Sequence, residues 1–251
     1  MPRRAIVLMN LGGPDSLSAV RPFLVNLFSD PAIIALPLPL RWLLARLIAS
    51  RRGKVARDIY AHLGGASPLL ANTEAQARAL EAELGAGYRC FVAMRYWHPL
   101  TRAAVAAVKA WQPDEVVCLP LYPQFSTTTT ASSLAAWRDE AERQRLGVPT
   151  RVVEPYPSAA GFVAALAGLI APVLDEARKA QKIRLLLSAH GLPLKIVRAG
   201  DPYPEQVRQT AAAVVRRLDR PDLDWVVCYQ SRVGPLAWLG PQTDAEIRRA
   251  G

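Results

Sequence analysis

The sequence predicts an α/β protein built from two halves, each with a parallel sheet flanked by helices. Short apolar runs alternate along the chain with longer segments whose apolar residues recur at helical spacing. Most of the short runs are continuously apolar, which is typical of parallel strands covered on both faces. A length of 251 residues fits two smaller doubly wound halves better than one sheet. We expect the halves to comprise residues 1–135 and 136–251.

Each element follows from its local pattern. The runs predicted to be strands are, in chain order, residues 5–11, 89–94, 115–121, 151–153, 183–188 and 224–230. The segment 73–84 is expected to be a helix that begins at Thr73, a residue type that caps helices. Residues 158–179 carry apolar side chains at helical spacing, and 205–218 form a helical pattern after a Pro-Tyr-Pro start.

The composition narrows the class of protein. The net charge of +10 is compatible with nucleic acid, an anionic membrane surface or an acidic small ligand. Most arginines are dispersed and no zinc-finger or RNA-binding signature occurs, so nucleic acid is not an expected partner. No apolar run approaches the ~20 residues that span a bilayer, and the first residues do not form a secretory signal. We therefore expect a cytoplasmic protein.

The cysteines indicate neither a metal site nor a disulfide framework. Cys90, Cys118 and Cys228 are far apart and form no C-x-x-C pair. Each lies in or beside a strand-like run, so three buried, reduced thiols are expected.

Unusual and polar residues gather directly after the predicted strands. Five strands run into such segments, which are residues 10–15, 95–99, 122–133, 188–191 and 230–235. Ligands of open parallel sheets bind outside the carboxyl ends of the strands. These segments are therefore predicted to line one crevice.

The residue types in these segments indicate a large, flat, acidic ligand. The aromatic residues suit a broad apolar body, and the arginines and small hydroxyls suit carboxylates or phosphates. The glycine segments GGPD and GGASP match neither dinucleotide nor P-loop fingerprints, and no nucleophile elbow occurs. Nucleotide binding and a catalytic triad are thus disfavoured.

His190 has two interpretations at this point. A lone histidine beside an apolar run is most often a hydrogen-bonded structural residue. Its place at a strand end also suits a metal ligand, for Fe²⁺ or Zn²⁺, or a proton acceptor near neutral pH. Of the other histidines, His98 precedes Pro99 and shapes a turn, and His62 is expected to be exposed.

Residues 36–52 also have two interpretations. Leu40, Leu43, Leu44, Leu47 and Ile48 form one helical stripe, which is typical of a helix facing a core. The alternative is a basic amphipathic lip that contacts a membrane or an apolar ligand, with neighbouring cations meeting anionic groups.

The motifs, taken in order, resemble the ferrochelatase family from Ala5 to Gly251. They are NLGGPDS, FLVNLFSDPAII, GGASP, AMRYWHPLT, LPLYPQFSTTTTASS, SAHGLP, GDPYP and YQSRVGPLAWLGPQTD. The resemblance implies two Rossmann-like, chelatase-type halves with a ligand cleft between them. It implies a lyase of haem biosynthesis that inserts Fe²⁺, as substrate, into protoporphyrin IX; coproporphyrin is the close variant.

The resemblance also implies roles for particular residues. His190 is the expected catalytic and metal-binding histidine. Arg95 and Tyr96 match a cleft pair. Tyr60, Ser67 and Ser231 match positions near the porphyrin carboxylates, and Arg51 and Arg52 match the lip. The remaining porphyrin-binding positions line the pocket and are Met9, Tyr122, Ser126 and Trp238. Contact of the lip with the inner membrane face would be peripheral.

The sequence departs from the family pattern at several points. Ala66 and Ala131 stand where glycine is usual, which places side chains where the backbone needs freedom. Thr127 replaces the cysteine of cluster-containing members, so no iron–sulfur cluster or other permanent cofactor is expected. The family continues beyond the segment matching residue 251 with a strand, a loop bearing the cleft glutamate and a helix. The second half is therefore expected to be incomplete, and the alternative function is a catalytically impaired porphyrin-binding protein.

Overall fold

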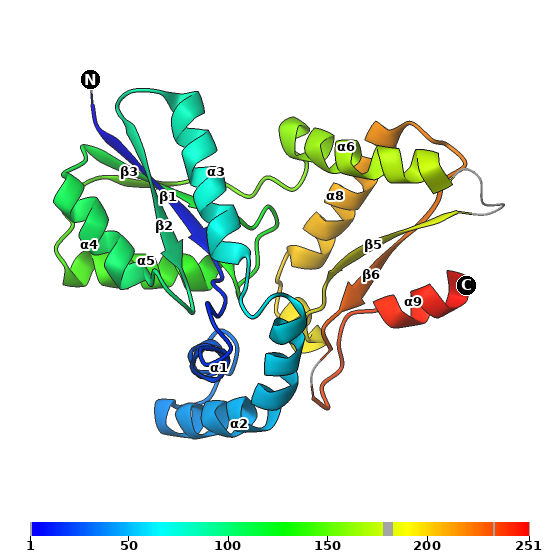
Figure 1. Cartoon of the computed structure of the whole chain (residues 1–251), viewed down its shortest axis with the longest axis horizontal. Helices are drawn as coiled ribbons and strands as arrows, with labels where there is room; N and C mark the ends of the chain where they lie inside the picture. The colour runs from blue at the N-terminus through cyan, green and yellow to red at the C-terminus, as the bar shows by residue number, and fades with distance from the viewer. Residues whose placement is uncertain (1, 178–182, 233, 251) are drawn as a thin grey trace. The chain divides into compact units, whose positions relative to one another are not determined.

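The computed structural model describes residues 2–177, 183–232 and 234–250 (Figure 1). The chain forms two compact units. The first comprises Met1–Tyr122 and Thr127–Glu154, and the second comprises Pro123–Ser126 and Pro155–Gly251. The boundary expected after residue 135 lies inside a helix of the first unit, and residues 136–154 belong to that unit.

The first unit contains a four-stranded parallel sheet with the order β2-β1-β3-β4. Its strands are β1 (Arg4–Asn10), β2 (Tyr88–Met94), β3 (Glu115–Pro120) and β4 (Thr150–Val152). The strands predicted in this part of the sequence are confirmed to within one residue at each end. All interior residues of β1 are buried, as its continuous apolar run predicts.

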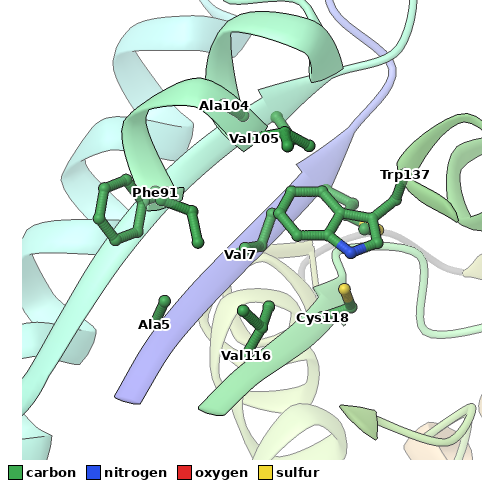
Figure 2. Close-up of a cluster of buried hydrophobic side chains, with 11 residues drawn as sticks. Ala5, Val7, Phe91, Ala104, Val105, Val116, Cys118 and Trp137 are labelled. Atoms are coloured by element: carbon green, nitrogen blue, oxygen red, sulfur yellow. The ribbon is translucent and has the colours of Figure 1, made fainter. Parts of the chain in front are cut away.

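Helices cover both faces of this sheet. Val7 of β1 packs with Val105 and Trp137 on one face, in the cluster that Figure 2 shows. Ile6 and Leu8 point to the other face and pack against Ala77. Successive strand residues point to opposite sides, so one apolar strand supplies both cores. The first unit is therefore a three-layer α/β structure.

The helices of the first unit are α1 (Val20–Phe28), α2 (Leu38–His62), α3 (Leu69–Leu84), α4 (Thr101–Trp111) and α5 (Thr130–Arg143). The predicted start of α3 at Thr73 is wrong. Thr73 is buried inside the helix, where its hydroxyl donates to the Leu69 carbonyl at 2.7 Å and accepts from the Asn10 amide. The Thr73 hydroxyl, which suggested a helix cap, thus forms its hydrogen bonds from inside the helix instead.

Helix α2 corrects the interpretation of residues 36–52 as an ordinary core-facing helix. Only Ala45 and Ala49 are buried among its described residues. Leu40, Leu43 and Leu47 of the predicted stripe are exposed, and Leu43 is 62% exposed. Helix α2 packs against α1, and its buried residues are small alanines rather than the larger leucines.

The second unit has a two-stranded parallel sheet of β5 (Arg184–His190) and β6 (Asp224–Gln230). Its helices are α6 (Ala160–Ala177), α7 (Leu194–Arg198), α8 (Tyr203–Leu218) and α9 (Thr243–Ala250). Helix α8 packs on β6, α6 packs on α8, and α9 contacts both strands. Residues 178 and 179 of the helix predicted over 158–179 lie outside the described residues. Leu185, Leu186 and Leu187 are half-buried, so the expected burial on both faces is not reached here.

Helix α6 qualifies the expectation that no segment approaches membrane-spanning length. By length and composition alone, this 18-residue helix could cross a bilayer. Core helices of soluble proteins have the same character, and Val163, Ala167 and Leu174 are buried in the contacts of α6. Leu169, at 74% exposed, lies on its outer face.

The cysteines are free, as expected, and two of the three are fully enclosed. Cys118 and Cys228 are buried, and Cys90 is partly buried. Burial raises the pKa of the Cys118 thiol to about 12. For Cys90, burial and the negative charge of Glu81 raise the pKa to about 11.

Candidate functional site

The carboxyl ends of β1 and β2 are joined by backbone hydrogen bonds. The Arg95 N–H donates to the Asn10 carbonyl, and the Tyr96 N–H donates to the Leu11 carbonyl, each at 2.9 Å. The Asn26 amide donates to the Tyr96 carbonyl at 3.0 Å. The two polar strand ends are therefore brought together in the first unit, as the parallel-sheet argument predicts.

The two glycines of the GGPD segment after β1 allow other parts of the first unit to approach the backbone closely. A Cβ atom at Gly13 would lie 2.4 Å from the Ser67 hydroxyl oxygen, and one at Gly12 would lie 2.9 Å from the Trp97 nitrogen. Gly12 also has a φ of +84°, which glycine adopts without strain. The Ser67 N–H donates to the Pro14 carbonyl at 2.8 Å. The glycines thus hold Ser67, an expected carboxylate-binding residue, against the end of β1.

Asp30 is the centre of a buried polar cluster in the first unit. It accepts a hydrogen bond from the Tyr96 hydroxyl at 2.7 Å and one from the Ser132 hydroxyl. An Arg95 Nη lies 2.8 Å from the same carboxylate, and Arg95 Nε donates to Ser132 at 2.7 Å. The cluster therefore fixes the guanidinium of Arg95 while leaving 24% of its side chain exposed.

The ionisation of this cluster follows from its contacts. Burial opposes the charge of Asp30, but hydrogen bonds from Ser132, Tyr96 and the Ala32 backbone, with the charge of Arg95, lower its pKa below the ordinary value. Burial, followed by the charge of Asp30, raises the pKa of the Tyr96 hydroxyl. Tyr96 is only 1% exposed, so the structure places it as support for Arg95 rather than at a surface.

A pocket of about 680 Å³ opens beside this cluster. The residues lining it are Asp30, Pro31, Ala32, Arg95, Leu100, Thr101, Arg102, Thr127, Ala131, Ser132, Ala135, Ala136, Asp139, Glu140 and Arg143. Its volume is in the range of small-molecule sites. The lining contains three arginines and three carboxylates, so its charge does not by itself select an acidic ligand.

The other expected residues of the first unit lie in different settings. Met9 is buried in the core with Val7, which is a packing position. Tyr122 is half-buried with its hydroxyl 3.4 Å from that of Ser133, and burial raises its pKa. Tyr60 lies in the last turn of α2, where burial raises its pKa. Arg51 and Arg52 are exposed on α2.

The two glycine replacements fit the backbone. Ala131 lies in the first turn of α5, in a helical conformation that suits alanine. Among the described residues, the non-glycine residues with positive φ are Gln112, Arg145, Asp219 and Ser231. Ala66 is not one of them, so its side chain costs no backbone strain.

His190 is the last residue of β5 in the second unit, and it is exposed. Its Nδ1 atom lies 2.7 Å from the Gly191 carbonyl oxygen. The parallel register places His190 opposite Gln230, so Ser231 follows β6 at the same edge of the sheet. The predicted position of His190 at a strand end is therefore confirmed.

Ser231 and Trp238 lie beside this strand end. Ser231 is exposed and has a φ of +70°, an uncommon conformation for a residue with a side chain. Such conformations are concentrated at functional sites. Trp238 is half-buried, and its ring would lie 3.4 Å from a Cβ atom at Gly191.

The GDPYP motif supports the same strand end. Asp201 accepts from the Ser126 hydroxyl at 3.0 Å and from the Tyr203 N–H at 3.0 Å. The Tyr203 hydroxyl accepts a hydrogen bond from the His190 N–H, and burial raises the pKa of this hydroxyl to about 12. Ser126 is 1% exposed, so the structure gives it an internal contact rather than an open one.

Sequence reasoning did not single out Asp30, Asp201 or Tyr203. Each lies within a quoted motif, SDP or GDPYP, in which an aspartate precedes proline. Such an aspartate suggests only a turn. The side-chain partners of Asp30 and Asp201 are at least 65 positions away along the chain, so no local pattern reveals these pairs.

The fold and these residues define an α/β protein whose polar candidate residues gather at the carboxyl ends of parallel strands. A family model described as Ferrochelatase matches residues 3–251. The chain belongs to the ferrochelatase family. It is accordingly a porphyrin metal chelatase, a lyase of haem biosynthesis that inserts iron into a porphyrin.

Relatives from several bacteria support this membership. The Ferrochelatase of Caulobacter vibrioides (strain NA1000 / CB15N) is 57% identical over 252 residues, which cover 98% of this chain and 72% of the relative. That of Phenylobacterium zucineum is 56% identical, with coverage of 98% and 72%. The protein of Wolbachia sp. subsp. Drosophila simulans is 48% identical, with coverage of 99% and 80%. A solved solute-binding protein from Agrobacterium vitis has a TM-score of 0.32 at 15% identity over 91% of this chain and 58% of that chain, too low to inform the fold.

Proposed function

We propose that this chain inserts Fe²⁺ into protoporphyrin IX, with His190 as the residue that accepts a pyrrole proton or meets the metal. The observation that carries the proposal is an exposed imidazole at the end of β5 whose Nδ1 is already bonded. Insertion releases two pyrrole N–H protons and changes no oxidation state. A neutral imidazole suits this chemistry because it can accept a proton near neutral pH.

Hydroxyl and guanidinium groups would hold the porphyrin propionates. Ser67 and Ser231 lie at strand ends or against them, and Arg51 and Arg52 are exposed cations on α2. Tyr60, on the same helix, and Tyr122 would contribute hydroxyls and aromatic faces. Arg95, fixed by Asp30, has a partly exposed side chain that would make a polar contact. Trp238 would provide an apolar face for the macrocycle.

The substrate preference is tested by zinc insertion followed by fluorescence, with iron insertion under anaerobic conditions as the second assay. We expect kcat/KM for protoporphyrin IX to exceed that for coproporphyrin at least about tenfold. Coproporphyrin carries two extra carboxylates, which lose hydration when the porphyrin binds. A desolvation cost of about 1.4 kcal/mol is enough to produce a tenfold difference in kcat/KM. The reverse preference would assign coproporphyrin. Tight porphyrin binding without turnover would instead support a binding protein.

No permanent cofactor belongs to this proposal. Iron–sulfur clusters are held by cysteine thiolates. Position 127 is an exposed threonine, and Cys118 is buried in the core of the first unit. Iron enters only as substrate.

We further propose that α2 contacts an anionic membrane surface peripherally, in a protein that is otherwise cytoplasmic. Leu38, Leu40, Trp42, Leu43 and Leu47 are exposed on this helix. Exposed cations accompany them on the same helix, namely Arg46, Arg51, Arg52, Lys54 and Arg57. Apolar side chains with basic neighbours are typical of helices that lie in a membrane interface.

Flotation with vesicles tests this contact. We expect binding to vesicles rich in phosphatidylglycerol and little binding to pure phosphatidylcholine. Leu43→Glu should weaken binding at least tenfold, because it removes leucine burial worth about 1.5–3 kcal/mol and adds a negative charge. Leu169→Glu on α6 is the matched control, since Leu169 is a similarly exposed leucine in the second unit. Equal loss in both variants would refute a specific role for α2.

A further inference from the structure

The ring of His190 is oriented by a hydrogen bond to the next residue. Its Nδ1 atom lies 2.7 Å from the Gly191 carbonyl oxygen. A carbonyl oxygen only accepts, so Nδ1 carries the proton in this pair. In a neutral imidazole, Nε2 then keeps the free lone pair.

The backbone on either side of the Gly191 carbonyl is held by hydrogen bonds. The Gly191 N–H donates to the Gln230 carbonyl at 2.8 Å. Beyond it, the Leu239 N–H donates to the Leu192 carbonyl at 3.0 Å, and the Leu194 N–H donates to the Ala237 carbonyl at 2.8 Å. Residues 192–194 and 237–239 thus pair as a short antiparallel bridge. The segment 191–194, which carries the Gly191 carbonyl, therefore has little freedom to turn.

Glycine at position 191 allows this close approach. A Cβ atom there would lie 3.1 Å from the Gln230 carbonyl oxygen and 3.4 Å from Cε3 of Trp238. The φ of Gly191 is not in the left-handed region, so the constraint is space rather than backbone conformation. The Tyr203 hydroxyl, which accepts from the His190 N–H, fixes the preceding backbone as well.

We propose that Gly191, held by the Gln230 carbonyl and by the pairing of residues 192–194 with 237–239, is a positioning residue. It keeps His190 as the Nδ1–H tautomer, so that Nε2 is the acting nitrogen. This inference rests on the role proposed for His190. The Nε2 lone pair would take the proton of a pyrrole N–H, and the N–H electron pair would stay on the pyrrole nitrogen to bind Fe²⁺. Free histidine favours the proton on Nε2, so the Gly191 bond reverses the ordinary preference.

The test is a long-range ¹H–¹⁵N spectrum of the full chain labelled with ¹⁵N-histidine, at a pH where the rings are neutral. The chain has three histidines, so His62→Gln and His98→Gln assign the signals. We expect a protonated Nδ1 and an unprotonated Nε2 at His190. His62 is an internal reference for this pattern, because its Nδ1 lies 2.7 Å from the Asp58 carbonyl. A protonated Nε2 at His190 would overturn the proposal.

Gly191→Ala provides the second arm, with Gly168→Ala as its control. Nothing lies within 4 Å of a Cβ atom at Gly168 on α6. Gly191→Ala should shift His190 toward the Nε2–H form and lower kcat for zinc insertion about tenfold with little change in KM, since small misplacements of a reacting group are costly. Lower kcat with an unchanged tautomer would contradict the positioning role. If the wild-type chain is inactive but shows the Nδ1–H pattern, the proposed function is refuted and the tautomer assignment still holds. If Gly191→Ala does not fold, the wild-type spectrum decides.

Discussion

Alanine in place of His190 is expected to lower the kcat of metal insertion by ~10²–10⁴-fold, the usual contribution of a general base. The side chain lies at the end of β5 and is exposed, so its removal creates no core cavity and should leave the fold intact. Porphyrin affinity should change little, because the loss falls on the proton and metal steps. Initial rates of zinc insertion, with porphyrin binding measured by fluorescence quenching, check both expectations.

His62→Ala is the matched control for this change. His62 is also exposed, and its Nδ1 also faces a backbone carbonyl, that of Asp58 at 2.7 Å. It therefore repeats the same chemical deletion at a position with no assigned role. If the His190 and His62 variants insert metal at the same rate, His190 has no role in the mechanism.

Asparagine in place of Asp30 is expected to reduce the free energy of unfolding by about 2–4 kcal/mol at pH 7. Loss of one partner of a buried ion pair typically costs about 3–5 kcal/mol, and the partial exposure of Arg95 lowers that figure. Asparagine also places an amide donor among the donors Tyr96, Ser132 and Arg95. Urea unfolding followed by tryptophan fluorescence measures the change. Asp139→Asn, an exposed carboxylate on the same pocket, should stay within about 0.5 kcal/mol of the wild type.

The effect of Asp30 should depend on pH in one direction. Its folded-state pKa lies below the ordinary value of 3.8, so the folded protein holds the ionised form more favourably than the unfolded chain does. That stability is fully present above the unfolded-state pKa and is lost as the pH falls through the folded-state pKa. The difference between wild type and Asp30→Asn should therefore shrink below about pH 4. A difference that grows toward acid pH would contradict this assignment.

The central strand β1 was predictable because burial on both faces imposes a continuous apolar run. The place of His190 was predictable for a related reason, since the end of an apolar run marks the end of a strand. The exposure of helix α2 was not predictable, because a stripe of leucines shows only that one face is apolar and does not show whether another part of the protein covers that face. The buried residues of α2 are Ala45 and Ala49 instead.

The supporting polar residues could not be predicted for a different reason. Asp30 meets Tyr96 from 66 positions away, and Ser126 meets Asp201 from 75 positions away. Pairs of this kind depend on how loops are brought together by the sheet, and they leave no periodic signal in the sequence. Strand-end position and the family resemblance therefore grouped Tyr96 and Ser126 with residues that contact the ligand, while in the structure both are buried and make supporting contacts.

The raised pKa values of the thiols have a practical consequence for chemical labelling. Thiolates, not thiols, react with maleimides, and those of Cys90 and Cys118 are scarce at neutral pH because their pKa values are about 11 and about 12. Cys228 is enclosed and inaccessible to a bulky reagent. A single cysteine introduced on the exposed face of α2 would thus carry a fluorophore selectively, without removal of the native cysteines.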